Sequence, residues 1–217
     1  MEKNRTGQVI AILALVVGIV SLSIGFASFA SVLNIQASAT VKPDSSTMNV
    51  DFSSSSTAVE VNEITPTATP VSLETTTATI DNSSDPTIKN LSATFTEPGQ
   101  KVVYEFYAFN AGELSAYLKS IVYGNVTGKS TNKVCTAAEG TTDALVQKAC
   151  EKIAIKVKVG NELETSSGIA SITNHALAKG SSEKVIVTLE YEANADRADG
   201  DFNVSFGDIT LNYSSAD

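Results

Sequence analysis

The feature that most constrains this chain is an uncharged apolar segment, residues 9–33, close to its N-terminus. No charged residue occurs between Thr6 and Val41, and the segment is preceded by Lys3 and Arg5. A helix of about 20 apolar residues spans the roughly 30 Å hydrocarbon core of a bilayer, so we expect residues 9–33 to enter a membrane as a helix. Basic residues stay on the cytoplasmic side, which places the rest of the chain outside the cell.

The sequence leaves open whether this segment is retained. It is longer than the apolar region of about 7 to 15 residues in an ordinary signal peptide, which favours a permanent anchor. The tripeptides Ser28-Phe29-Ala30 and Ala37-Ser38-Ala39 nevertheless have the small-x-small pattern that signal peptidases cleave. A cleaved leader and a retained helix are therefore both compatible with the sequence.

Small residues recur every three or four positions within the segment and would lie along one stripe of a helix. They are Ala11, Ala14, Gly18, Ser21, Gly25 and Ser28. In lipid, helices associate through small residues that let their backbones approach, so the stripe is a candidate helix-packing face. Small residues are also common in membrane helices generally, which is the alternative explanation.

We divide the chain into a leader, residues 1–36, and one extracellular domain, residues 37–217. The part exported beyond residue 30 is acidic. Removing Lys3, Arg5 and Glu2 from the 15 basic and 24 acidic residues leaves 13 and 23, a net charge near −10. Nucleic acids and anionic lipids are bound by clustered Lys and Arg, so this balance excludes them as expected partners of the domain.

Alternating apolar residues predict β-strands through most of the domain. The clearest example has Ile153, Ile155, Val157 and Val159 on one face. Residues 102–110 are apolar on both faces, which is typical of a central strand. Gly99 completes a tight turn before that strand. Many short strands separated by turns predict an all-β fold, an antiparallel β-sandwich.

The last strands contain a change of phase. Phe202, Val204 and Phe206 are apolar at even positions, whereas Ile209 and the apolar residues after it occupy odd positions. One residue must be absorbed near Gly207. A bulge within one bent strand would do this, and so would a tight turn between two strands; we favour the bulge because either half alone is short.

One short helix interrupts the strands at residues 142–152, where helix-forming residues follow the potential N-cap Thr142. The helix carries Cys150, and the only other cysteine is Cys135. In an oxidising compartment we expect these two to form a disulfide, with two free thiols as the alternative. Two cysteines and one histidine are too few for a structural zinc site, which usually has four such ligands.

No pattern predicts an enzyme, a metal site or a cofactor. His175 is the only histidine and lies in an expected loop, where we expect an exposed side chain without a chemical role. The motifs H-E-x-x-H and G-x-S-x-G and a phosphate-binding glycine loop are absent. The acidic run at residues 194–201 could ligate calcium, but its spacing is not that of an EF-hand, so we favour a solvated hairpin loop.

Several stretches together resemble the TasA/camelysin family of exported bacterial surface proteins. They are GFASFASVLNIQASATVKP, TMNVDFS and FTEPGQKVVYEFYAFNAGELSAYLKSI, with a Pro-Gly turn before a strand that closes on Asn-Ala-Gly. The resemblance covers about half of the chain. It implies a jelly-roll-like sandwich and a role in extracellular fibres of the biofilm matrix. The metalloendopeptidase activity linked with the name camelysin has no matching ligand set here.

The family forms fibres when each subunit lends an N-terminal strand to the next one. In this chain the corresponding donor segment is Ile35, Gln36, Ala37, Ser38, Ala39, Thr40 and Val41. The segment is uncharged and rich in β-formers, as a strand added to a sheet edge should be. The same residues could instead form the first strand of their own domain.

The sequence therefore predicts a non-enzymatic, exported structural subunit, anchored at the cell surface or assembled into fibres by strand donation. One alternative is a pilin-like filament whose retained helices pack through the small-residue stripe. Another is a monomeric, membrane-anchored module that binds a ligand through its loops.

Overall fold

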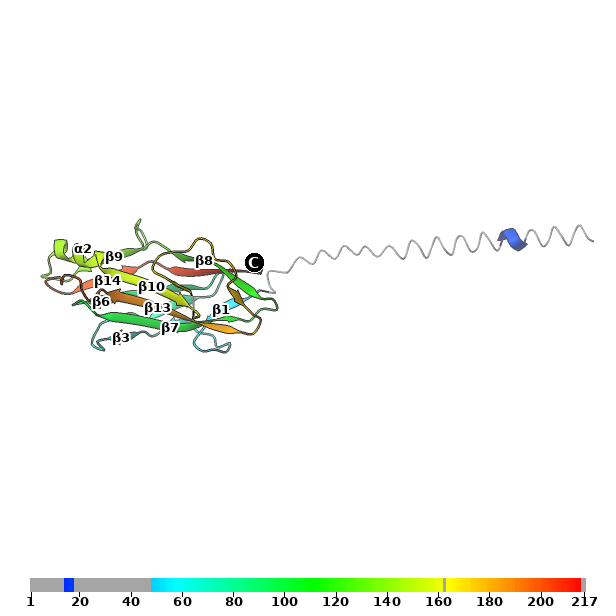
Figure 1. Cartoon of the computed structure of the whole chain (residues 1–217), viewed down its shortest axis with the longest axis horizontal. Helices are drawn as coiled ribbons and strands as arrows, with labels where there is room; N and C mark the ends of the chain where they lie inside the picture. The colour runs from blue at the N-terminus through cyan, green and yellow to red at the C-terminus, as the bar shows by residue number, and fades with distance from the viewer. Residues whose placement is uncertain (1–13, 18–47, 162, 216–217) are drawn as a thin grey trace, which may run out of the picture. The chain divides into compact units, whose positions relative to one another are not determined.

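The computed structural model describes residues 14–17, 48–161 and 163–215 (Figure 1). The chain divides into two compact units, Met1–Lys42 and Pro43–Asp217. The second unit contains β1 (Val50–Ser53), β2 (Glu63–Ile64), β3 (Thr67–Thr69), β4 (Ala78–Asp81), β5 (Thr87–Lys89), β6 (Ser92–Phe95), β7 (Lys101–Asn110), β8 (Ala116–Tyr123), β9 (Lys133–Ala137), α2 (Asp143–Glu151), β10 (Ile153–Val159), β11 (Leu163–Thr165), β12 (Ala176–Leu177), β13 (Ser182–Tyr191), β14 (Phe202–Phe206) and β15 (Ile209–Ser214).

The predicted leader helix falls mostly outside these residues. Residues 14–17 are helical, and the remainder of the segment 9–33 is not among the described residues. Among the residues that are described, no helix has both the length and the apolar character needed to cross a bilayer.

The first layer is a sheet of strand order β1-β7-β13-β10-β11, in which all pairs are antiparallel. β7 lies inside this sheet, as its apolar residues on both faces predict. β13 pairs along one edge of β7, whereas β1 and β3 share the other, β1 near Asn110 and β3 near Lys101. Among the described residues β1 is therefore a short edge strand, and on its far side Ser53 forms an isolated antiparallel bridge with Glu60 of the following loop.

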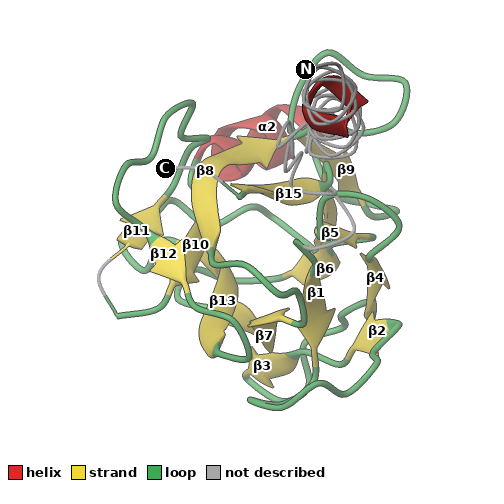
Figure 2. Ribbon diagram, turned by 90° about the vertical axis from the view of Figure 1, so that its right-hand side faces the viewer, coloured by secondary structure: helices red, strands yellow, loops and turns green. Residues whose placement is uncertain are grey.

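The second layer has two sheets that continue each other along the chain. Strand order is β12-β8-β15-β5-β4-β2 in one and β6-β14-β9 in the other. β5 leads into β6 across residues 90–91, and β14 leads into β15 across residues 207–208. The layer is thus a set of bent strands, which together with the first layer makes the predicted antiparallel sandwich (Figure 2).

The phase change near Gly207 occurs within one bent path, because β14 and β15 do not pair with each other. The neighbouring path changes phase at the same level: Ile88 is buried before the bend, and Leu91 is buried after it. Ser205 lies opposite Ser92, and Ile209 lies opposite Ile88. The pairing register between the two paths is therefore the same before and after the bend. The expected bent strand is confirmed. The expected bulge at Gly207 is not, because a bulge adds a residue to one strand only, whereas here both paired strands change phase at the same level.

Gly207 is required at this bend by its surroundings. A Cβ atom at Gly207 would come within 2.0 Å of the carbonyl oxygen of Gly124. The N–H of Gly207 donates to the carbonyl of Asn132, and the N–H of Gly124 donates to that of Asp208. The loop between β8 and β9 is therefore joined to the bend by backbone hydrogen bonds.

The core lies between the two layers and is closed by aromatic residues. Phe95 and Phe202 of the second layer contact Tyr191 of the first, with ring centroids 6.2 and 5.6 Å from the tyrosine ring. Phe52 packs edge-on against Phe106, 4.5 Å away. All five side chains are at most 1% exposed. Every described core residue belongs to the second compact unit, so this domain has a hydrophobic core of its own.

The two lateral sides of the sandwich are closed differently. On one side α2 connects β9 of the second layer to β10 of the first, and the Cys135–Cys150 disulfide joins α2 to β9. The other side lies between the edge of β1 and the strands β4 and β2 (Figure 2). There the described chain crosses from one layer to the other through loop residues 54–62.

Candidate functional site

The candidate site is the outer edge of β1. The carbonyl of Asn49 accepts a hydrogen bond from the N–H of Ala111, just beyond β7, so the backbone groups of Asn49 point toward β7. In an antiparallel strand this direction alternates from residue to residue. The backbone N–H and C=O groups of Asp51 therefore also point toward β7, whereas those of Val50 and Phe52 point away from it. β1 presents these groups at the edge of its sheet.

At Phe52 the edge is occupied by a side chain instead of a strand. The N–H of Phe52 donates to Asn82 Oδ1 at 2.9 Å, and Asn82 Nδ2 donates to the carbonyl of Phe52 at 3.2 Å. A carboxamide offers one acceptor and donors, the same groups as a peptide unit. Asn82 directly follows β4 of the other layer, so it fills the position of a neighbouring strand at this one residue.

A groove runs alongside this edge and has a volume of about 380 Å³. Its walls come from β1, from the crossing loop and from both layers. They are Asp51, Phe52, Ser53, Ala58, Val59, Glu60, Asn62, Ile80, Asn82, Phe109 and Ala111. Six of the eleven lining residues are apolar and five are polar or charged, and Val59 is 44% exposed. The groove thus combines a backbone edge with apolar surface, which are the two requirements for binding an extended peptide by strand addition.

The groove also affects the one carboxylate that β1 contributes to it. Burial raises the pKa of the Asp51 carboxyl above its ordinary value, and the hydrogen bond that Asn49 Nδ2 donates at 2.7 Å partly opposes this rise. A raised carboxyl pKa means that ionisation is less favourable in the folded chain than in the unfolded one. Asp51 therefore lowers stability above its folded pKa, and the cost vanishes below the unfolded value near 3.8.

We accordingly expect Asp51→Asn to be more stable than the wild type at pH 7 and equal to it at about pH 3, as measured by urea unfolding. Asp81→Asn is the control of opposite sign. The Lys89 ammonium, 2.6 Å away, holds the pKa of Asp81 well below its ordinary value, so this variant should lose stability at pH 7. A change of stability in the same direction at pH 7 in both variants would contradict the opposite pKa shifts of Asp51 and Asp81.

Nearly all of the sequence-predicted assembly residues lie outside the described part of the chain. The donor segment, residues 35–41, lies outside the described residues, as does the small-residue stripe except for Ala14. Ala14 belongs to the helical residues 14–17 and is exposed.

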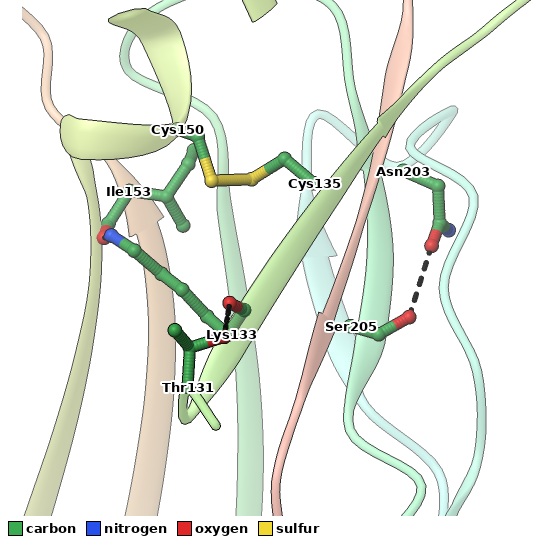
Figure 3. The surroundings of a disulfide bond; sticks show 7 residues. All are labelled: Thr131, Lys133, Cys135, Cys150, Ile153, Asn203 and Ser205. Carbon is green, nitrogen blue, oxygen red and sulfur yellow. Dashed lines mark hydrogen bonds between the residues drawn. A yellow bond between two sulfur atoms is a disulfide. The ribbon is translucent and has the colours of Figure 1, made fainter. Parts of the chain in front are cut away.

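The predicted disulfide is confirmed. Cys135 of β9 and Cys150 of α2 are bonded, with their Cα atoms 6.0 Å apart (Figure 3). Lys133, also on β9, extends past the disulfide and donates from Nζ to the carbonyl of Ile153 at 2.5 Å. Burial lowers the pKa of Lys133, and the nearby Glu151 opposes this shift. The bond is consistent with an oxidising compartment.

His175 is not the exposed bystander that the sequence suggested. Its Nε2 lies 2.7 Å from Glu183 Oε2, and its side chain is only 22% exposed. The hydroxyl of Tyr213 donates to the other oxygen of Glu183 at 2.9 Å. Burial, and then the charge of Glu183, raise the pKa of Tyr213 well above its ordinary value. Glu183 faces inward from β13, and a carboxylate so placed needs partners, which explains the position of His175.

The acidic run at residues 194–201 has a structural role that its composition did not reveal. Asp199 accepts hydrogen bonds from the N–H and the hydroxyl of Thr142, the residue that precedes α2. These bonds lower the pKa of Asp199. Thr142 is the N-cap by position, as predicted, although its own side chain does not cap the helix. Within the described ranges no three or more His, Cys, Asp or Glu side chains gather as metal ligands would.

Asn82 is the site residue that the sequence did not identify. It stands in a polar stretch, as the first residue of Asn-Ser-Ser. Its one positional signal is that it follows the alternating residues of β4 directly. The contact with Phe52 joins residues 30 positions apart, so periodicity could not predict it.

Comparison with known proteins leaves the site to be interpreted from its own geometry. No family model, no curated protein and no solved structure matches the chain.

Proposed function

We propose that this chain is a non-enzymatic, exported structural subunit that assembles into extracellular fibres by strand donation, with the β1 edge as the acceptor. The observation that supports this most directly is the hydrogen-bonding edge at Val50 and Phe52, which opens on a partly apolar groove of about 380 Å³. A strand laid along such an edge gains main-chain hydrogen bonds, and its alternate side chains enter the groove. The jelly-roll-like topology and the biofilm role implied by the resemblance belong to the same proposal.

The occupant that we assign to the groove is the segment Ile35–Val41 of a neighbouring copy. The segment is free of charge, so it brings no ion into a groove where Asp51 is already poorly solvated. Its apolar residues Ile35, Ala37, Ala39 and Val41 alternate with polar ones, which matches one face toward a groove and one toward water. The alternative is that the segment forms the first strand of its own domain.

Charge placed on the two faces of the segment tests this proposal. We expect Ala37→Lys with Ala39→Lys to abolish fibres, because both lysines would enter the groove. Gln36→Lys with Ser38→Lys carries the same added charge on the opposite face and should still assemble. Electron microscopy of the purified exported protein distinguishes filaments from dispersed monomers. Filaments from the first variant, or monomers from wild-type protein at high concentration, would contradict strand donation.

The mature N-terminus provides a second test of the same proposal. Cleavage after Ala30 leaves residues 35–41 on the subunit, whereas cleavage after Ala39 removes most of them. We therefore expect N-terminal sequencing of the fibre subunit to begin near Ser31. A chain that retains residues 9–33 in its filaments would favour a pilin-like helical core, and a monomer with the leader intact would favour an anchored binding module.

A further inference from the structure

The hydrogen bonds of Asn82 occupy the same groups that an added strand would use. Phe52 has one N–H and one C=O on the outer edge, and both are bonded to the Asn82 carboxamide. A buried backbone group is costly to leave unpaired, so the carboxamide keeps these groups satisfied while no strand is present. Natural sheets protect edge strands in comparable ways against pairing with other chains.

The backbone beside Asn82 is held in place independently of this contact. Asp81 accepts hydrogen bonds from the N–H and the hydroxyl of Ser83 and from Lys89 Nζ. β4 pairs with β5 up to Asp81. Rotation of the Asn82 side chain therefore frees the two groups of Phe52 without moving β4 or β5. Glu60 of the following loop bridges Ser53 on the same edge, which limits how far an added strand can extend.

We propose that Asn82 acts as a placeholder that keeps the β1 edge closed in the free subunit, and that a strand from a second copy must displace it to pair with β1. This inference rests on the proposed strand donation and adds the control of that step. By occupying Phe52, Asn82 suppresses unspecific pairing of β1 with other chains. It also lowers the affinity for the donor strand, because the donor must replace the hydrogen bonds of Asn82.

The test uses the domain of residues 43–217, whose core is complete within itself, and a synthetic peptide of residues 34–42 as the donor. In the wild type the two hydrogen bonds between Asn82 and Phe52 compete with the peptide. Asn82→Ala should therefore bind the peptide about tenfold more tightly. Asn212→Ala is the matched control, since Asn212 Nδ2 donates to Ser120 Oγ at 2.7 Å and not to a strand edge.

A second measurement needs no variant. In the ¹⁵N-labelled wild-type domain, the side-chain amide protons of Asn82 should shift and exchange faster with solvent when the peptide is added, because they leave the carbonyl of Phe52. Those of Asn212 should not change. The affinity measurement is made on variants whose circular dichroism matches that of the wild type.

The outcomes separate the two proposals. Equal peptide affinity in the wild type and Asn82→Ala, with unchanged Asn82 amide resonances, overturns the placeholder while strand donation stands. Absence of peptide binding to either folded protein overturns strand donation and the placeholder together. Tighter peptide binding by Asn82→Ala, with no change in Asn212→Ala, supports strand donation and the placeholder.

Discussion

Phe202→Ala is expected to lower the free energy of unfolding by about 3–5 kcal/mol, the usual cost of truncating a fully buried phenylalanine. Phe202 is 0% exposed, and its ring contacts Phe95 of the same layer and Tyr191 of the other. Alanine would leave a cavity between two layers that backbone pairing holds in place. Urea unfolding followed by circular dichroism measures the loss.

The control for this prediction is Tyr107→Ala. Tyr107 lies on the outward face of β7, where it is only partly buried. Truncation there should cost about 1 kcal/mol or less, since little packing is lost. Similar losses in the two variants would show that the inter-layer aromatic cluster is not the centre of the core.

The second large effect is expected from the disulfide. Replacing both Cys135 and Cys150 with alanine should cost about 3 kcal/mol in the chain-entropy model, given a sequence separation of 15. The bond joins α2 to β9, so its loss also frees the helix that closes one lateral side of the sandwich.

Reduction of the wild-type domain provides the matching measurement. Unfolding in the presence of a reductant should show the same loss, and the double variant should be insensitive to the reductant. If reduction destabilised the double variant as well, the effect would arise elsewhere. If neither treatment changed stability, the bond would be dispensable for closing this side.

The parts of the fold that the sequence predicted are those set by local pattern. β7 follows from its apolar residues on both faces, β10 from its alternation, the tight turn from Gly99 at φ 89°, and α2 from its helix formers. β9, β11 and β12 were missed, because these strands have two to five residues and their pairing depends on distant neighbours. β3 lies between two prolines and forms only at an edge of β7, where a missing N–H is tolerated.

The candidate site was even harder to predict from local pattern than the short strands. The sequence identified the disulfide, and it identified a donor segment through the resemblance, but it gave no position for an acceptor. The acceptor edge depends on which side of β7 receives β1 and on which layer receives β4, and both are decided by pairing across the fold. Asn82 and His175 both looked incidental, because their partners Phe52 and Glu183 belong to other strands.

The shared bend of the second layer constrains how this domain can change in evolution. Because the strand path through Asn90 and the one through Gly207 reverse their faces at one level, losing a single residue from one path would turn all its later side chains inside out. A simultaneous loss from the other path would keep the two paths in register but would still turn the apolar side chains beyond the bend away from the first layer. The lengths at these two places should therefore stay fixed, while the loop between β8 and β9 can vary in length beyond its two backbone ties.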